Sequence, residues 1–182
     1  EFNGQIASFI TTRNISRQIR MQHALENSER KFRELADLLP QTVFEFDTQG
    51  NVTFFNKAGR TVYGFGENDT NINALSGIAA YDRERMFNFI LDAVGKGETN
   101  LTSEYTAKRT DDSTFPVMFY GNLMYENGQY IGMRGLVVDI SERKAMEEAL
   151  KKSERKFREL ADLLPQTIFE LDLNGHVTYL NK

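Results

Sequence analysis

Two kinds of hydrophobic spacing alternate along the chain, and each predicts a different element. In residues 16–39 and again in 141–164, apolar side chains recur at steps of three and four, which places them on one face of a helix. Similar spacing predicts a short helix at 58–66 and a longer one at 82–94. Runs rich in β-branched and aromatic residues predict strands at 42–47, 52–56, 101–109, 115–124 and 130–138. The chain is therefore expected to carry a sheet flanked by helices.

A long internal repeat predicts how these elements are organised. The segment Ser28–Thr42 recurs without change as Ser153–Thr167, an offset of 125 residues, and similarity at this offset continues to Lys182. Such a period fits a small domain with its connector rather than a solenoid unit of about 20 to 50 residues. The predicted parts are the last strand of a preceding repeat (1–15), a connector helix (16–39), a complete domain (40–140), a second connector helix (141–164) and the first hairpin of a following repeat (165–182).

The apolar faces of the two connector helices have the heptad spacing of a short coiled coil. A seam of fewer than about four heptads, with serine at one position, is marginal alone and needs the flanking domains or a partner to hold it. We expect a homodimer through these helices. The seam residues are Met21, Leu25, Phe32 and Leu35 in the first helix, and Met146, Leu150, Phe157 and Leu160 in the second.

Composition narrows the classes of function. Of the 182 residues, 40% are hydrophobic and 26% are charged, which is typical of a protein that buries a core. The net charge of −4, with both signs interleaved, provides no basic face for nucleic acid. Neither a signal peptide nor a run of about 20 apolar residues is found, so we expect a cytoplasmic location without membrane insertion by these residues, in a parent protein that is soluble or anchored elsewhere.

The residues that bind metals and cofactors are scarce. The sequence contains no cysteine, and its two histidines are His23 and His176. We therefore do not expect a disulfide, a flavin–cysteine adduct or a histidine-ligated haem, and the identity of any other cofactor stays open.

The order of the elements, together with several short motifs, resembles the PAS domain family over residues 29–144. Asp112 stands at a turn position where the family usually has glycine, which implies a positive φ there. The resemblance implies an α+β fold, namely a five-stranded antiparallel sheet of order 2-1-5-4-3 with short helices on one face, flanked by amphipathic connector helices. The motifs are Asp47-x-x-Gly50-x-Val52, Tyr81-Asp82-Arg83 and Asp139-Ile140-Ser141-Glu142-Arg143-Lys144.

The resemblance also implies a role in signalling. Family members are sensory and dimerisation modules in proteins such as the histidine kinases of two-component systems and cyclic-dinucleotide enzymes. No kinase, cyclase or phosphoacceptor motif occurs in these residues, so we predict a non-catalytic module that relays a signal through its exit helix. The predicted relay residues are Asp139, Ser141 and Arg143. The alternative is a ligand-independent scaffold that only spaces and assembles its parent protein.

Strand alternation directs one set of side chains toward the long helix. This set either fills an ordinary core or lines a pocket for a small molecule. Its members are Phe44, Phe46, Phe54, Asn56, Met86, Phe89, Ile90, Tyr105, Phe119 and Met133.

The two ends of the chain are predicted to carry strands without a complete sheet. Unpaired strand edges recruit partners. We therefore expect either that an N-terminal strand of one molecule pairs with the C-terminal hairpin of another, or that one end is disordered or helical.

Overall fold

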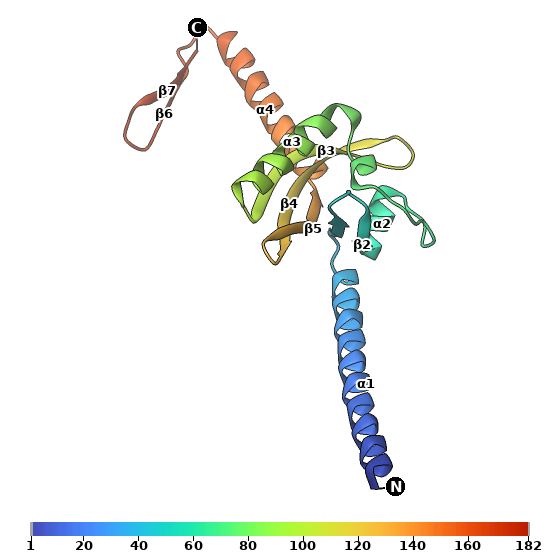
Figure 1. The fold of residues 1–182 in the computed structure, drawn as a ribbon. Helices are drawn as coiled ribbons and strands as arrows, with labels where there is room; N and C mark the ends of the chain where they lie inside the picture. The colour runs from blue at the N-terminus through green and yellow to red at the C-terminus, as the bar shows by residue number, and fades with distance from the viewer. Residues whose placement is uncertain (1, 182) are drawn as a thin grey trace. The chain divides into compact units, whose positions relative to one another are not determined.

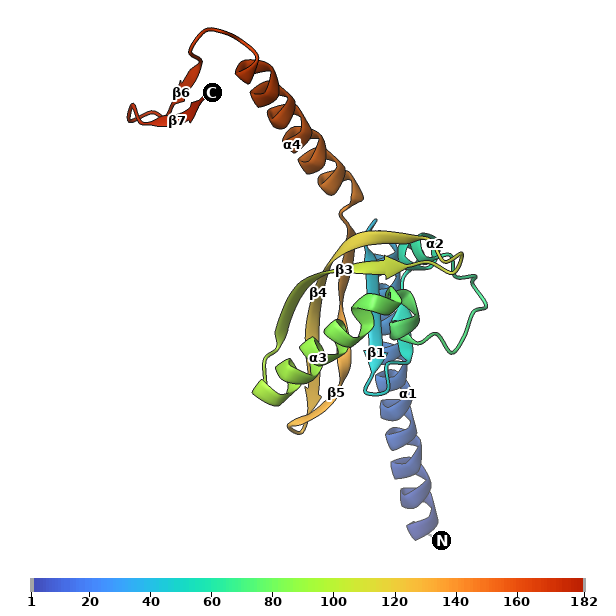
Figure 2. The ribbon, with the colours of Figure 1, turned by 90° about the horizontal axis from the view of Figure 1, so that it is seen from above.

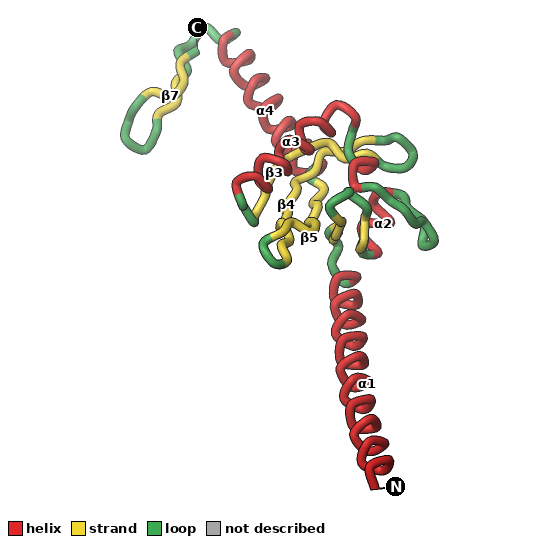
Figure 3. Tube along the Cα trace, in the orientation of Figure 1, coloured by secondary structure: helices red, strands yellow, loops and turns green. Residues whose placement is uncertain are grey.

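The computed structural model describes residues 2–181, and for residues 2–16 it describes the backbone alone. The chain divides into two compact units between Val138 and Asp139, and each unit is described by itself. The first unit contains α1 (Phe2–Asp37), β1 (Thr42–Asp47), β2 (Val52–Phe55), α2 (Lys57–Tyr63), the 3-10 helix η1 (Ala74–Gly77), α3 (Ala80–Lys96), β3 (Asn100–Lys108), β4 (Thr114–Glu126) and β5 (Gln129–Asp139), which ends at the boundary. The second contains α4 (Ser141–Asp162), β6 (Phe169–Leu171) and β7 (Val177–Leu180) (Figures 1 and 3).

The first unit is built on a five-stranded sheet of order β2-β1-β5-β4-β3, which confirms the predicted fold class. β1 pairs antiparallel with β2 on one side and with β5 on the other, and β3 pairs antiparallel with β4. α3 lies across one face of this sheet (Figure 2). The chain reverses between β3 and β4 at Asp112, whose φ of 67° confirms the positive value predicted from the sequence.

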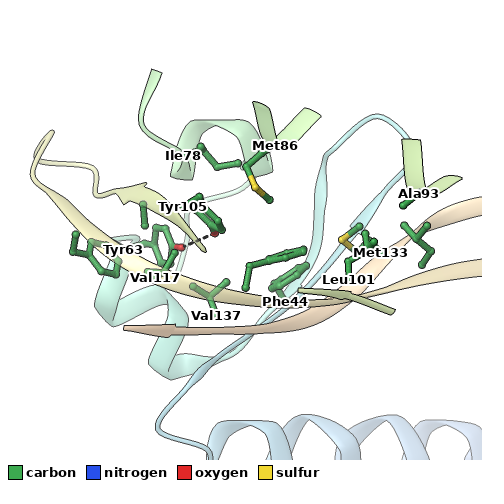
Figure 4. Close-up of a cluster of buried hydrophobic side chains, with 14 residues drawn as sticks. Phe44, Tyr63, Ile78, Met86, Ala93, Leu101, Tyr105, Val117, Met133 and Val137 are labelled. Carbon is green, nitrogen blue, oxygen red and sulfur yellow. Dashed lines mark hydrogen bonds between the residues drawn. The ribbon is translucent and has the colours of Figure 1, made fainter. Parts of the chain in front are cut away.

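The core lies between the sheet and α3. Met86 of α3 and Met133 of β5 are almost completely buried, and Ile78 approaches Tyr105 from the helical side (Figure 4). Asp82 fastens the helix to the sheet edge, because its Oδ2 accepts a 2.7 Å hydrogen bond from the backbone N–H of Thr106. These contacts set the distance between the helix and the strands.

The N-terminal strand predicted within residues 1–15 is wrong, because α1 begins at Phe2 and continues to Asp37. A strand without a neighbour leaves its backbone groups unpaired, whereas a helix satisfies them within the segment. The N-terminal segment is therefore not a strand that could pair, as expected, with the C-terminal hairpin of another molecule. That residues 1–15 belong to a preceding repeat stays a prediction, and Glu1 lies outside the described residues.

The side chain of Asn56 joins α1 to the start of the sheet. Its amide nitrogen donates to the carbonyl oxygens of Ala36, at 2.8 Å, and Gln41, at 2.9 Å. Its amide oxygen accepts from the backbone N–H groups of Val43 and Gly59, both at 2.9 Å. Asn56 has no exposed surface, so these bonds replace those that water would make. One amide thus fixes the end of α1, the following loop, the start of β1 and the N-terminus of α2.

Further contacts press the end of α1 against β2. The ring centroids of Phe32 and Phe54 are 5.3 Å apart, and the Arg33 guanidinium lies 5.5 Å from the centre of the Phe54 ring. Asp37 Oδ1 accepts a 2.7 Å hydrogen bond from the backbone N–H of Lys57. The last turns of α1 are therefore held by a ring contact, a cation–π contact and the Asn56 bonds together.

Replacing Asn56 by aspartate tests this joint, because a carboxylate keeps both acceptor positions but cannot donate to Ala36 and Gln41. We expect Asn56→Asp to lower the free energy of unfolding by about 2–4 kcal/mol at neutral pH. The loss should be smaller near pH 4, where a protonated carboxyl regains one donor. Urea unfolding followed by circular dichroism, with the wild-type chain measured at each pH, gives both values.

Asn88→Asp is the matched control, because Asn88 is exposed on α3. It should change the free energy of unfolding by less than about 0.5 kcal/mol. Equal effects of the two substitutions would contradict the structural role assigned to Asn56.

Candidate functional site

A cavity of about 220 Å³ lies between the sheet and the helices of the first unit. Strands β1, β2, β3, β4 and β5 contribute side chains to it, and so do α3, η1 and the turn between β1 and β2. Its apolar lining includes Phe44, Phe46, Val52, Phe55, Tyr63, Phe65, Ile72, Leu75, Ile78, Met86, Phe87, Ile90, Leu91, Val94, Tyr105, Phe119, Tyr130 and Val137.

Aromatic rings dominate this lining. Phe44 stacks on Phe46 and on Phe119, with ring centroids 5.6 Å apart in both pairs. Phe55 packs against Tyr63 at the same distance. Such a wall offers dispersion contacts and ring faces to an occupant, but few hydrogen bonds.

The polar side chains of the lining come mainly from the turn between β1 and β2 and from Asn73. The lining includes no lysine, arginine or histidine. Its charged member is Asp47, which is committed to its own turn. The hydrogen bond donated by the Asn51 side chain to Asp47 Oδ2, at 3.0 Å, helps to hold the pKa of Asp47 below its ordinary value. The cavity therefore suits a neutral molecule better than an ion.

Tyr63 and Tyr105 bring two hydroxyl groups together beside the cavity (Figure 4). Their oxygen atoms are 3.5 Å apart, and both residues are buried. Burial raises the pKa of Tyr105 from 10 to about 12, because the ionised phenol would lose its hydration. The pair supplies the cavity with neutral donors and acceptors at physiological pH.

Six of the ten predicted pocket residues line the cavity, and four do not. Met133 and Phe89 pack in or against the core without lining the cavity, and Asn56 binds backbone groups instead. The prediction for Phe54 is wrong, because a bulge between Glu45 and Phe46 changes the register of β2. The residues that do line it are Phe44, Phe46, Met86, Ile90, Tyr105 and Phe119.

The same bulge explains the residue that sequence alternation missed. Phe55 stands opposite Phe44 and faces the cavity, whereas Phe54 stands opposite Glu45 and meets Phe32 of α1. Strict alternation cannot place a bulge. Tyr63 and Phe65 were also missed, although two aromatic residues around a glycine at a helix end were a usable signal. Gly64 takes a φ of 81° there and ends α2.

The predicted relay residues lie where β5 passes into α4. Asp139 Oδ1 accepts a 2.8 Å hydrogen bond from the backbone N–H of Ser141, and the helix cap falls at Ile140. Arg143 forms an ion pair with Glu147 along the helix surface, with 3.8 Å between Arg143 Nη1 and Glu147 Oε1. The carboxylate of Asp139 therefore shapes the turn into α4.

The predicted seam residues of both connector helices are exposed. Each of the eight, from Met21 to Leu160, has at least 46% of its surface accessible. No described helix has the length and apolar character needed to span a bilayer. The described residues also contain no cluster of three or more acidic or histidine side chains that would hold a metal ion.

Tyr105→Phe should change how stability depends on pH. Because the phenol titrates near 10 when unfolded and near 12 when folded, the wild-type chain should lose stability as the pH rises above 10. Compared with Tyr105→Phe, the free energy of unfolding of the wild-type chain should fall by up to about 1.4 kcal/mol per pH unit. The total fall should be at most about 2.7 kcal/mol. Urea unfolding from about pH 8 to 11 measures this slope. Tyr81→Phe, at an exposed position, is the control and should keep the wild-type dependence of the free energy of unfolding on pH. If Tyr81→Phe removed this dependence as Tyr105→Phe does, the assignment to Tyr105 would be refuted.

Comparison with known proteins agrees with this geometry. A family model described as PAS domain matches residues 30–95. The PAS domain of a Colwellia psychrerythraea protein is 24% identical, with a TM-score of 0.56, over 62% of this chain and 97% of that one. A sensory box histidine kinase/response regulator from Burkholderia thailandensis is 16% identical, with a TM-score of 0.56, over 71% of this chain and 98% of that one.

A third solved structure is the N-terminal domain of a diguanylate cyclase with PAS/PAC sensor from Marinobacter aquaeolei. It is 14% identical, with a TM-score of 0.50, over 57% of this chain and 98% of that one. The comparison with curated proteins found no match. The family model covers the part of the chain from the end of α1 into α3, and β3 to β5 complete the same fold. The first unit of this chain therefore has the fold of a PAS domain.

Proposed function

We propose that this PAS domain is a sensor that binds a small, neutral, mainly apolar molecule and passes the state of its cavity to the connector helices. The 220 Å³ cavity between the sheet and the helices supports this function, and part of its lining, at Phe87 and Leu91, is exposed to solvent. Protein interiors are close-packed, and voids larger than a water molecule are few. A void of this size, lined by aromatic rings and two hydroxyl groups, supports a binding site.

The volume and the lining limit the occupant. An engineered cavity of about 150 Å³ accepts benzene, and sites for drug-sized ligands span about 300–1,000 Å³. A cavity of about 220 Å³ therefore suits a molecule of one or two rings. A hydroxyl or carbonyl group on that molecule could bond to Tyr63 or Tyr105, whereas an anion would meet no cation among the lining residues.

The connectivity of the strands supports a relay to α4. Val137 of β5 lines the cavity, and only Ile140 separates the end of β5 from the start of α4. Because no flexible spacer lies between them, a shift of β5 would move the start of α4 instead of being absorbed in a loop. The named solved structures include a histidine kinase/response regulator and a diguanylate cyclase, so we propose an output domain of either class in the parent protein.

The exposed seams support self-association of the connector helices. Apolar residues at heptad spacing along a helix pack best against the same seam of a second copy. The parent protein is therefore proposed to be a homodimer through these helices, joined in a tandem array. This repeat organisation rests on the 125-residue offset and on the hairpin β6–β7.

Native mass spectrometry of the purified chain tests the binding function. We expect a bound small molecule on the wild-type chain and its loss in Ile90→Phe, because the added ring fills the cavity. Ile131→Phe makes the same exchange at an exposed position outside the lining and should retain the molecule. A wild-type chain that carries nothing, and that gains no thermal stability from a panel of small aromatic compounds, would instead support the scaffold function.

Sedimentation equilibrium tests the dimer. Leu150→Glu places a charge in the proposed seam, so the dimer dissociation constant should rise at least about tenfold. Ala145→Glu, on the same helix but off the seam, should leave it within about twofold of the wild-type value. A wild-type chain that stays monomeric, or equal effects of the two substitutions, would contradict the proposed seam.

A further inference from the structure

The cavity of the first unit runs along the strands and has two unlike ends. On β5, Val137 pairs with the first residue of β1, and Met133 pairs with the fifth. Tyr63 and Tyr105 lie toward Val137 in the core, whereas Ala93 of α3 lies toward Met133 (Figure 4). The two hydroxyl groups are therefore at one end of the cavity, and the second half of α3 is at the other.

Exposure shows which of these ends is open. At the first end, Tyr63 and Tyr105 are 4% and 8% exposed. Toward the other end, Leu91 lines the cavity from α3 with 52% of its surface exposed, and Phe87, one helical turn earlier, is 50% exposed. The lining residues 47–50, in the turn between β1 and β2, are also partly or fully exposed. The cavity is therefore closed at the tyrosines and opens between α3 and this turn.

The cavity is also long and narrow. Its lining on α3 extends from Met86 to Val94, which is about 12 Å along a helix axis. Its lining on β1 extends from Thr42 to Phe46, which is about 13 Å along a strand. A volume of 220 Å³ spread over about 12 Å has a mean cross-section of about 18 Å². One ring seen edge-on, or one alkyl chain, fills such a section, whereas a broad or branched molecule does not.

The closed end offers hydrogen bonds to a neutral group. The hydroxyl oxygens of Tyr63 and Tyr105 are 3.5 Å apart, whereas an ordinary O–H···O bond measures about 2.5–3.0 Å. Two hydroxyl groups that bond so loosely to each other suit a third hydroxyl group, which both donates and accepts. An ionised group would lose its hydration there and meet no cation among the lining residues.

The walls between the two ends favour a ring. The ring of Phe44 is nearly parallel to those of Phe46 and Phe119, with interplanar angles of 13° and 19°. All three line the cavity. A ligand ring placed against them, either offset-stacked or edge-to-face, gains an aromatic contact that an alkyl chain does not make.

The open end favours an apolar group. The polar side chain of Asn73 is already engaged there, because its Oδ1 accepts from the N–H of Leu75 at 3.0 Å and its Nδ2 donates to the carbonyl oxygen of Gln49 at 3.3 Å. Phe87 and Leu91 leave apolar surface in water, and this surface is stabilised when another apolar group covers it. The polar and apolar ends of a matching ligand are thereby assigned.

We infer that the occupant is a rod-shaped, neutral phenol with an apolar substituent opposite its hydroxyl group, bound with the hydroxyl group inward. The hydroxyl group bonds to Tyr63 and Tyr105, and the substituent passes Met86 and Ile90 and ends at Leu91. A phenol is neutral at physiological pH, since its pKa is about 10. This inference rests on the proposed binding function and adds the class, shape and direction of the ligand.

Three probes separate the shape of the ligand from its polarity in titrations of the full chain followed by NMR. They are 4-butylphenol, its isomer 2-butylphenol and butylbenzene, which lacks the hydroxyl group. We expect 4-butylphenol to bind most tightly. The dissociation constant of 2-butylphenol should be at least about tenfold higher, because its broader shape does not fit the narrow section. That of butylbenzene should be about two- to tenfold higher, because one hydrogen bond is lost.

Substitutions and intermolecular NOEs then locate each end of the bound phenol. The double variant Tyr63→Phe/Tyr105→Phe should bind 4-butylphenol and butylbenzene within about twofold of each other. Tyr81→Phe/Tyr120→Phe, at exposed positions outside the lining, is the matched control and should keep the wild-type preference. On the wild-type chain, which does not depend on the folding of any variant, the butyl methyl group should give NOEs to Leu91 and none to Tyr105.

Four outcomes overturn the inference. Three are equal binding of the two isomers, the same preference for the phenol in both double variants, and an NOE between the butyl methyl group and Tyr105. The fourth is failure of all three probes to bind. Native mass spectrometry then decides the binding function separately, because a bound molecule that is lost in Ile90→Phe leaves that function standing without a phenol.

Discussion

A single buried amide determines how the five-stranded sheet is attached to the helix that precedes it. Asn56 holds two carbonyl groups near the end of α1 and two N–H groups at the starts of β1 and α2. An amide suits this position because it both donates and accepts, which neither a carboxylate nor a hydrocarbon does. A buried polar group without partners costs free energy, so the four segments are ordered together. The recurrence of the joint at Asn181 shows that it is a local property of the repeated sequence.

This joint lies next to the cavity. Phe55, which lines the cavity, directly precedes Asn56, and Thr42, another lining residue, directly precedes Val43, whose N–H the amide holds. On the other side of β1, β5 lines the cavity and then leads into the second connector helix. The strands of one small site are thus continuous with both connector segments. Packed elements change position in discrete steps, and the proposed relay from the cavity to the helices would use this continuity.

Strand alternation and helical spacing predicted the strands and the long helix, because both are local signals, whereas the order of the strands and the turn at Asp112 were implied by the resemblance to the PAS family. Prediction from the sequence failed where contacts between residues far apart in the chain determine the structure. The bulge in the β1–β2 pair exchanges the roles of Phe54 and Phe55, and no local pattern marks it. A strand was predicted within residues 1–15, yet without neighbouring strands this segment is the first part of α1, which begins at Phe2. The cavity could not be predicted from the sequence, because the same pattern of apolar residues is found when a core is completely filled. The Tyr63–Tyr105 pair depends on a contact across 42 residues.

We propose that the state of the cavity is coupled to both connector helices. Hydrogen exchange measured by mass spectrometry on wild type, Ile90→Phe and the control Ile131→Phe tests it directly. Filling the cavity should change amide exchange severalfold in the last turn of α1 and the first turn of α4, and the control substitution should leave both unchanged. Changes confined to the strands and to α3, with both helix ends exchanging as in the wild type, would contradict the coupling.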